Sequence, residues 1–217
     1  MTSKLPPSAS VATAAEAGKL FAPSAARNVD AITQALLTHA PQADRALEIA
    51  SGTGQHVVAF ARALPDVKWQ PTEIDATRRI SIDSYAAEAG LTHVAPAIDL
   101  NATRAGWAKD HAGQDLILLC NLLHLVSSPA AETLINEAAM ALAPLGRLML
   151  YGPFKRDGQL ISEGDIGFDA ALRAADPAIG YKDTADMDRW LARAGLMVLT
   201  HHDMPANNLA IMAEKPA

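Results

Sequence analysis

The sequence lacks the features that mark several specialised classes of protein. It holds one cysteine, Cys120, so it forms no internal disulfide, which suits a reducing compartment such as the cytoplasm. No apolar run approaches the length of a membrane span, and residues 1–7 carry one lysine and no apolar core of a secretory signal. Only 5% of the 217 residues are aromatic and 19% are charged, whereas half are apolar. These proportions predict one compact α/β domain with a full core.

The charge and the histidines limit the partners. The formal net charge is −6 and the isoelectric point is near 5.6, which disfavours a wide nucleic-acid interface. His93, His111, His201 and His202 lack cysteine or paired carboxylate neighbours at metal-ligand spacing, so no metal site is predicted. We therefore expect a small-molecule partner, with no nucleic acid and no membrane. A monomer and a homodimer both remain open.

Apolar segments alternate with segments of helical periodicity along most of the chain. We expect residues 1–22 to be loosely ordered, with a short helix over 11–20, and residues 23–217 to form the domain. The predicted strands cover residues 46–51, 67–73, 94–99, 116–122, 146–151, 197–203 and 209–215. The predicted helices cover residues 24–39 with Ser24 as N-cap, 55–64, 77–89, 104–111, 130–143 and 183–194. This order predicts an α/β fold: a Rossmann-like, seven-stranded, mostly parallel sheet with helices on both faces and an antiparallel last strand.

Residues 46–56 carry the most informative pattern. An apolar run ends in Gly52-Thr53-Gly54, and helical spacing follows directly. Glycine allows backbone dihedral angles that a Cβ atom forbids. The small residues, Ser51 among them, also let backbone N–H groups face a ligand at the positive end of the helix. Such a loop usually holds a nucleotide-like cofactor.

The residues around this loop distinguish between cofactors. A dinucleotide-binding loop would need a third glycine at position 57, where Val57 stands. Glu48, four residues before Gly52, lies on a strand that is normally apolar in dinucleotide-binding proteins. An acidic residue before Gly-x-Gly resembles the S-adenosylmethionine (SAM) loop of class I methyltransferases. There, the carboxylate helps to position the loop near the cofactor's amino-acid end.

Acidic residues follow the next two predicted strands. Glu73 ends the second strand, where a carboxylate can accept hydrogen bonds from both ribose hydroxyls. Asp75 competes for this role, and a carboxylate here could instead favour the dipole of the following helix. Asp99 and Leu100 end the third strand and could meet the adenine amine and ring face. A helix-capping role for Asp99 is equally open.

The ends of the fourth and fifth predicted strands carry candidates for chemistry. His124, three residues after Asn121, has an ordinary pKa near neutrality and could act as a general base or orient a substrate. It could equally be a hydrogen-bonded histidine in a wall. Tyr151 offers a hydroxyl and Phe154 a pocket wall, with core packing as the alternative for both. Cys120 reads as a core residue rather than a nucleophile.

Several further segments together resemble one family over nearly the whole chain. The matching segments are residues 23–28, 48–56, 69–71, 151–154, 168–169, 176–177 and 204–208, with Asn121 and His124. The sequence resembles the methyltransferase-like protein 26 family, also called the domain of unknown function 938 family. The resemblance implies a class I SAM-binding fold and methyltransferase activity, with no settled acceptor. It also implies roles for Arg27, Asn28, Gln55, His56 and the pair Asn207-Asn208.

Pattern and resemblance together define the predicted site. The cofactor-binding residues are Arg27, Asn28, Glu48, Ser51, Gly52, Thr53, Gly54, Gln55, His56, Glu73, Asp99, Leu100 and Asn121. The catalytic residues are His124 and Tyr151, and the substrate pocket includes Phe154, Asn207 and Asn208. The chain departs from the family at Asp165, Ile179 and Lys182, where asparagine, an aromatic residue and arginine are expected. These positions lie where class I enzymes often build the acceptor pocket, so the acceptor is expected to differ from that of relatives.

The function that fits these patterns is a SAM-dependent methyltransferase acting on a small molecule. The first alternative is a protein that binds SAM or a nucleoside without catalysis. The second is a nicotinamide-dependent oxidoreductase, which Val57 and Glu48 disfavour.

Overall fold

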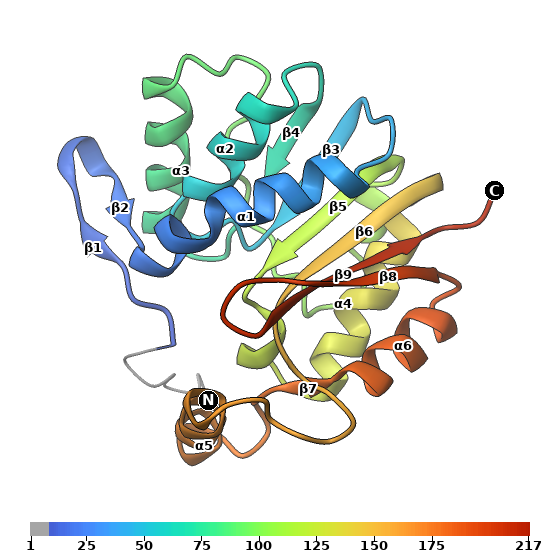
Figure 1. Ribbon diagram of the computed structural model, residues 1–217. Coiled ribbons are helices and arrows are strands. Elements are labelled where there is room, and N and C mark those ends of the chain that lie inside the picture. Colours follow the sequence, from blue (N-terminus) through green and yellow to red (C-terminus); the bar gives the residue numbers. More distant parts are fainter. Residues whose placement is uncertain (1–8) are drawn as a thin grey trace.

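A seven-stranded sheet forms the centre of the molecule (Figure 1). The structure, a computed structural model, describes residues 9–217. The strands lie in the order β4 (Lys68–Pro71), β3 (Arg45–Ile49), β5 (Gln114–Cys120), β6 (Leu142–Lys155), β9 (Asn208–Glu214) and β8 (Met197–Asp203), and β7 (Lys182–Asp183) pairs with the end of β6. The first four pair in parallel, whereas β9 is antiparallel to both of its neighbours. The predicted mostly parallel sheet with an antiparallel last strand is confirmed.

Helices cover both faces of this sheet. One face carries α1 (Pro23–His39), α2 (Gln55–Ala63) and α3 (Ala76–Glu88), and the other carries α4 (Ser128–Ala141) and α6 (Thr184–Arg193). A further helix, α5 (Glu163–Ala175), lies apart from both layers, beyond the strand ends that α2 and α3 follow (Figure 1). No helix of residues 9–217 is both long and apolar enough to cross a membrane.

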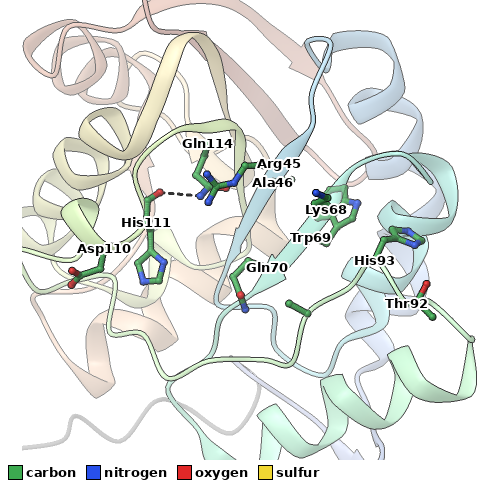
Figure 2. Close-up of a pocket in the computed structure, with 11 residues that line it drawn as sticks. Arg45, Ala46, Lys68, Trp69, Gln70, Thr92, His93, Asp110, His111 and Gln114 are labelled. Atoms are coloured by element: carbon green, nitrogen blue, oxygen red, sulfur yellow. Dashed lines mark hydrogen bonds between the residues drawn. The ribbon is translucent and has the colours of Figure 1, made fainter.

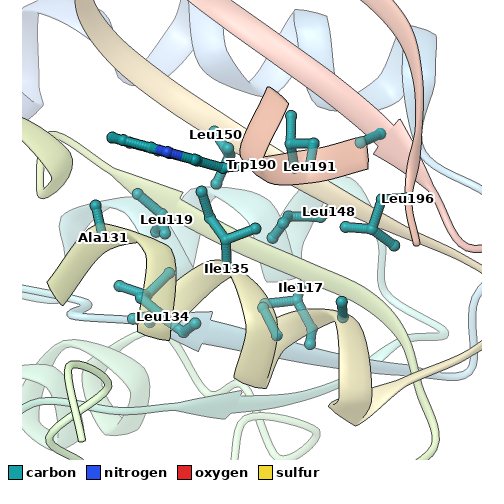
Figure 3. Close-up of a cluster of buried hydrophobic side chains, with 14 of the residues drawn as sticks. Ile117, Leu119, Ala131, Leu134, Ile135, Leu148, Leu150, Trp190, Leu191 and Leu196 are labelled. Carbon is teal, nitrogen blue, oxygen red and sulfur yellow. The ribbon is translucent and has the colours of Figure 1, made fainter. Parts of the chain in front are cut away.

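Alternate residues of the central strands explain why both faces are covered. On β5, Ile117 and Leu119 point toward α4 and α6, whereas Leu116 and Leu118 point toward α1 and α2, and all four are fully buried. Figure 3 shows the first pair on either side of Ile135 of α4, in the same cluster of buried side chains. Burying such a side chain contributes about 1.5–3 kcal/mol. A strand that is apolar on both faces therefore belongs in the middle of a covered sheet.

The N-terminal elements differ from the prediction. Residues 11–20 do not form a helix. They belong to a small hairpin of β1 (Thr13–Ala14) and β2 (Leu20–Phe21) around a 3-10 turn, where Ala17 and Gly18 have positive φ angles of 56° and 78°. The expectation for residues 1–8 lies outside the described residues. Ser24 is not the N-cap of α1, because the helix begins at Pro23, whose fixed φ suits the first helical position.

Two other predicted elements also change, and one helix of the structure was not predicted. The third strand is reduced to two isolated bridges, Trp69 with Val94 and Thr72 with Ile98, and Pro96 between them has no N–H to donate. The helix expected over 104–111 is only a 3-10 turn, Ala108–Asp110, preceded by Gly106 at a φ of 102°. The sequence did not predict α5, whose two glycines lower its helix propensity.

Candidate functional site

The turn between β3 and α2 uses its two glycines for different purposes. Gly52 has a φ of 61°, but a Cβ atom there would meet nothing closer than Arg78 Nη1 at 3.8 Å. At this position glycine is needed for the backbone angle alone. At Gly54 the φ is 95°, and a Cβ would also lie 2.7 Å from the Cα of Ile82 on α3. Gly54 therefore lets α3 pack directly against the loop.

Glu73 joins this turn to the end of β4. Its Oε2 accepts a hydrogen bond from the backbone N–H of Gly52 at 3.0 Å, and its Oε1 accepts one from Ile74 N–H at 2.9 Å. Asp75 has another task, because its Oδ1 accepts hydrogen bonds from the N–H groups of Thr77 and Arg78 and caps α3. The structure thus sets Glu73 against the glycine turn and Asp75 at the helix start.

A cavity of about 400 Å³, which we name the loop cavity, opens beside these residues. Six predicted cofactor-binding residues line it: Ser51, Gly52, Thr53, His56, Glu73 and Asn121. Ala9, Ser10 and Val11 from the N-terminal segment and Leu122, Leu125 and Val126 from beyond β5 complete much of the wall. Burial lowers the pKa of His56 to about 4, so its imidazole is neutral at pH 7, and it hydrogen-bonds Asn28 Oδ1 at 2.8 Å.

Glu48 lies beneath the glycine turn and is 1% exposed. Burial raises the pKa of its carboxyl to about 8; a hydrogen bond with Ser51 opposes the rise and the charge of Glu73 adds to it. Within residues 9–217, Oε2 of Glu48 is buried without a hydrogen-bond partner. An orphaned acceptor at this place fits a site completed by a ligand or water that donates a hydrogen bond.

A second cavity of about 680 Å³, the His124 cavity, adjoins the first. The two share the lining residues Ala9, Val11, Ser24 and Asn121. The remaining residues come from α1, the ends of β5 and β6, α5, the segment before β7 and the β8–β9 turn: Pro23, Arg27, Asn28, His124, Tyr151, Pro153, Asp165, Phe168, Tyr181, Pro205, Ala206 and Asn208. The predicted catalytic residues His124 and Tyr151 thus face one space.

His124 is neutral at physiological pH. The residue is 4% exposed and lies in a 3-10 turn directly after β5. Burial lowers the pKa of its imidazole to about 3, the nearby Lys182 lowers it further, and Asp169 opposes the change. Burial also raises the pKa of Tyr151 to about 12, so this phenol keeps its proton. Of the two, the neutral imidazole of His124 is the stronger base.

The sequence agrees with one family model along most of its length. The model, described as "Protein of unknown function (DUF938)", matches residues 19–215. The chain belongs to the DUF938 family.

Solved structures place this DUF938 protein among methyltransferase folds. A putative O-methyltransferase from Nostoc punctiforme PCC 73102 has a TM-score of 0.77 and 21% identity over 89% of this chain and 57% of its own. An O-methyltransferase family protein from Burkholderia thailandensis gives 0.76 and 17% over 89% and 57%. The SAM-dependent methyltransferase SibL gives 0.73 and 21% over 89% and 56%. The chain spans a little over half the length of these proteins and shares their class I fold.

Several residues predicted for the site of this DUF938 protein lie elsewhere. Asp99 is largely exposed and pairs with Arg79 at 3.7 Å, and it lines neither cavity. Leu100 packs against the α4–α6 side of the core, and Phe154 is buried within it. Asp99 and Leu100 follow the incomplete third strand, and neither residue lines the loop cavity or the His124 cavity.

Three other predicted cofactor residues line the His124 cavity or support the loop. Arg27 and Asn28 on α1 line the His124 cavity and not the loop cavity. Gln55, at the start of α2, accepts hydrogen bonds at Oε1 from Ala22 N–H at 2.7 Å and from the Thr53 hydroxyl at 2.9 Å. Gln55 thus ties the N-terminal segment to the glycine turn.

The sequence did not predict a network on α5 and its neighbours. Asp165 accepts hydrogen bonds from the hydroxyls of Ser162 and Tyr181 at 2.8 and 3.2 Å and from Asn207 Nδ2 at 3.3 Å. Asn207 itself has a φ of 60° in the β8–β9 turn. The departure from the family at Asp165 was the one signal that pointed to this position.

A third hollow lies at the amino-terminal ends of β3, β4 and β5, away from the strand ends that carry the two cavities (Figure 2). Arg45, Lys68 and Gln114, which begin β3, β4 and β5, line it with His93 and His111. No residue predicted for the site lines this hollow. In open α/β sheets ligands bind beyond the carboxyl ends of the strands, so the loop cavity and the His124 cavity together form the candidate site.

Proposed function

We propose that this DUF938 protein is a SAM-dependent methyltransferase whose acceptor is a small molecule with a hydroxyl group. One observation supports this most strongly: a cavity under a glycine turn and a cavity holding a neutral histidine adjoin at Asn121. A transferase needs this arrangement, because two bound molecules must meet with their reacting groups aligned.

The loop cavity would hold the cofactor. Glu73, fixed against Gly52, would accept hydrogen bonds from the ribose hydroxyls. Glu48 has an unpartnered oxygen beneath the turn, which suits the amino-acid end of SAM. When bound, SAM supplies a methyl group on a sulfonium that is already electrophilic, so the protein has only to position an acceptor and remove its proton.

His124 would remove the proton from the acceptor hydroxyl. The lowered pKa keeps its imidazole unprotonated, and the charge of Asp169 would favour the imidazolium that forms when the proton arrives. Phe168 and Tyr181 pack around the ring with centroids 5.6 and 6.1 Å away, and these apolar faces would exclude water from the acceptor. Tyr151 would remain a hydrogen-bond donor, because its pKa is too high for a base.

One observation favours a second candidate, a SAM- or nucleoside-binding protein without catalysis. An imidazole with a pKa near 3 is a weak base, so the same geometry suits a binder whose histidine is only a wall. The nicotinamide-dependent reading has less support, because Val57 occupies the place of the third glycine.

Calorimetry and turnover separate these candidates. We expect the protein to bind SAM and not NAD, and, in a panel of phenols, thiols and carboxylates, to transfer the methyl group to at least one phenol; transfer to thiols or carboxylates alone would contradict a hydroxyl acceptor. SAM binding without transfer to any acceptor would favour the binding protein, and NAD binding would favour the oxidoreductase. The acidic net charge argues against a nucleic-acid acceptor, which RNA and DNA in the same panel would test.

A further inference from the structure

Among the described residues 9–217, Asp165 is the one buried acid that lines the His124 cavity. It lies in the first turn of α5, is 9% exposed, and holds its carboxylate by hydrogen bonds from Ser162, Tyr181 and Asn207. Within residues 9–217, no lysine or arginine lies within ion-pair distance of it. Asp169, one turn along the same helix, is different, because it pairs with Arg173 at 2.7 Å. Asp165 thus presents a negative charge to the cavity with only neutral donors around it.

An aromatic wall stands beside this carboxylate. The rings of His124, Phe168 and Tyr181 meet one another at centroid distances of 5.6 to 6.1 Å and angles of 60° to 70°. Tyr181 bridges the two polar groups, since its ring packs against His124 while its hydroxyl donates to Asp165. Tyr181 therefore links the histidine and the acid within one wall of the cavity. Aromatic faces of this kind accept both aromatic rings and cations.

A positively charged side chain also lines the His124 cavity. Arg27 on α1 lines the cavity but is exposed to solvent. Charges in water are screened, whereas a charge in a buried site interacts strongly with a ligand. Asp165 is therefore expected to discriminate more sharply between charged ligands than Arg27.

We propose that Asp165 is a specificity-determining residue that selects an acceptor carrying a protonated amine. The acceptor class is a hydroxylated aromatic amine, with its hydroxyl toward His124, its ring against Phe168 and Tyr181, and its ammonium group toward Asp165. This inference rests on the proposed function, because it places the reacting hydroxyl at the histidine. It concerns only the choice of acceptor and adds no step to the reaction.

Three phenols whose side chains end in an ammonium, a neutral hydroxyl or a carboxylate group test this selection: tyramine, 4-(2-hydroxyethyl)phenol and 4-hydroxyphenylacetate. The full chain with SAM is assayed for methyl transfer to each phenol. We expect kcat/KM for tyramine to exceed that for the neutral alcohol by at least about tenfold, and the acid to be the poorest acceptor. Asp165→Asn keeps the size of the side chain and removes its charge. It should lower the tyramine-to-alcohol ratio by about tenfold or more and leave the value for the alcohol within a few-fold.

Glu163→Gln is the matched control, since it removes a negative charge from the same helix turn at an exposed residue that does not line the cavity. It should leave the ratio unchanged. The proposal is overturned if the wild-type protein prefers the alcohol or the acid, if Asp165→Asn keeps the ratio, or if Glu163→Gln shifts it equally.

Binding of the same phenols separates failure of this proposal from failure of the proposed function. Saturation-transfer NMR with the protein and S-adenosylhomocysteine measures the three phenols without any chemistry. If tyramine binds best and loses its advantage in Asp165→Asn while no methyl transfer occurs, the selection stands and the proposed function fails. If SAM is turned over but tyramine has no advantage, or if none of the three phenols binds, the selection fails.

Discussion

The loop cavity and the His124 cavity adjoin, but the chain builds them in different ways. The loop cavity is built around a short stretch, Ser51 to His56, which Glu73 contacts, and residues of the N-terminal segment and beyond β5 complete its wall. The His124 cavity gathers side chains from α1, α5, two strand ends and the β8–β9 turn. A cofactor common to many enzymes can be held by a local motif, whereas an acceptor is recognised by residues that only the complete fold brings together.

Gly52→Val is expected to have the largest effect, and to act on the loop cavity and not on the His124 cavity. A β-branched residue at a φ of 61° is strained, and its side chain would enter the loop cavity. SAM affinity should fall by at least about 100-fold, or roughly 2.7 kcal/mol, as measured by calorimetry. Gly90→Val is the control, because Gly90 has a φ of 66°, meets nothing within 4 Å and lines neither cavity. A folded Gly52→Val protein with unchanged affinity would refute the loop assignment.

His124→Ala is expected to show the converse pattern. Removing the base should lower the methyl-transfer rate by about 10²-fold or more, the usual scale for a general base, and leave SAM affinity within a few-fold. His93→Ala is the control, because His93 lines the hollow at the amino-terminal ends of the strands (Figure 2). Its Nε2 hydrogen-bonds the backbone oxygen of Ala61. A fully active His124→Ala enzyme would remove His124 from the mechanism. A large loss of SAM affinity would place it in the cofactor site.

Glu73→Ala tests which acid completes the loop cavity. It should weaken SAM binding by about 1–3 kcal/mol, the range for leaving buried polar groups unpaired. The reason is that Gly52 N–H and the ribose hydroxyls would both lose the carboxylate that accepts their hydrogen bonds. Asp75→Ala should instead remove the cap of α3, cost about 0.5–2 kcal/mol of stability and change affinity little. Calorimetry and urea unfolding of both variants measure the two effects. The reverse pattern would assign the ribose to Asp75.

Glu48→Gln tests the buried carboxyl beneath the glycine turn through the pH dependence of protein stability. The folded-state pKa of Glu48, about 8, lies above its ordinary 4.5, so between these values the folded protein holds a proton that the unfolded chain releases. The free energy of unfolding therefore falls as pH rises through this window. Glutamine does not titrate, so from pH 5 to pH 8 the wild-type Tm should fall by several degrees more than that of Glu48→Gln, equivalent to about 3 kcal/mol. If the Tm of the two proteins changed equally with pH, this would contradict a buried, protonated Glu48.

The same contrast explains what could be predicted from the sequence. The strands β3 to β6 and the glycine turn follow from local patterns, namely apolar runs and residues that permit positive φ. Asp165, Tyr181 and Asn207 lie up to 42 residues apart along the chain, and no local pattern joins them. The interpretation of Asp99 depended on a third strand, and Pro96 and the short bridges leave that strand incomplete. Strand-end rules locate a site, but they do not identify which side chains reach it.

The position of β9 has a consequence for how the protein is made. This strand lies between β6 and β8, and Lys215 just beyond it exchanges backbone hydrogen bonds with Leu145 and Gly146. Synthesis proceeds from the N-terminus, so β6 and β8 are both made before the strand that lies between them, and neither has this partner until residues 208–214 are available. Open edges of this kind invite pairing with other nascent chains. Completion of the sheet therefore waits for a strand that is made after both of its neighbours, and a chain without residues 208–214 would leave the facing edges of β6 and β8 unpaired.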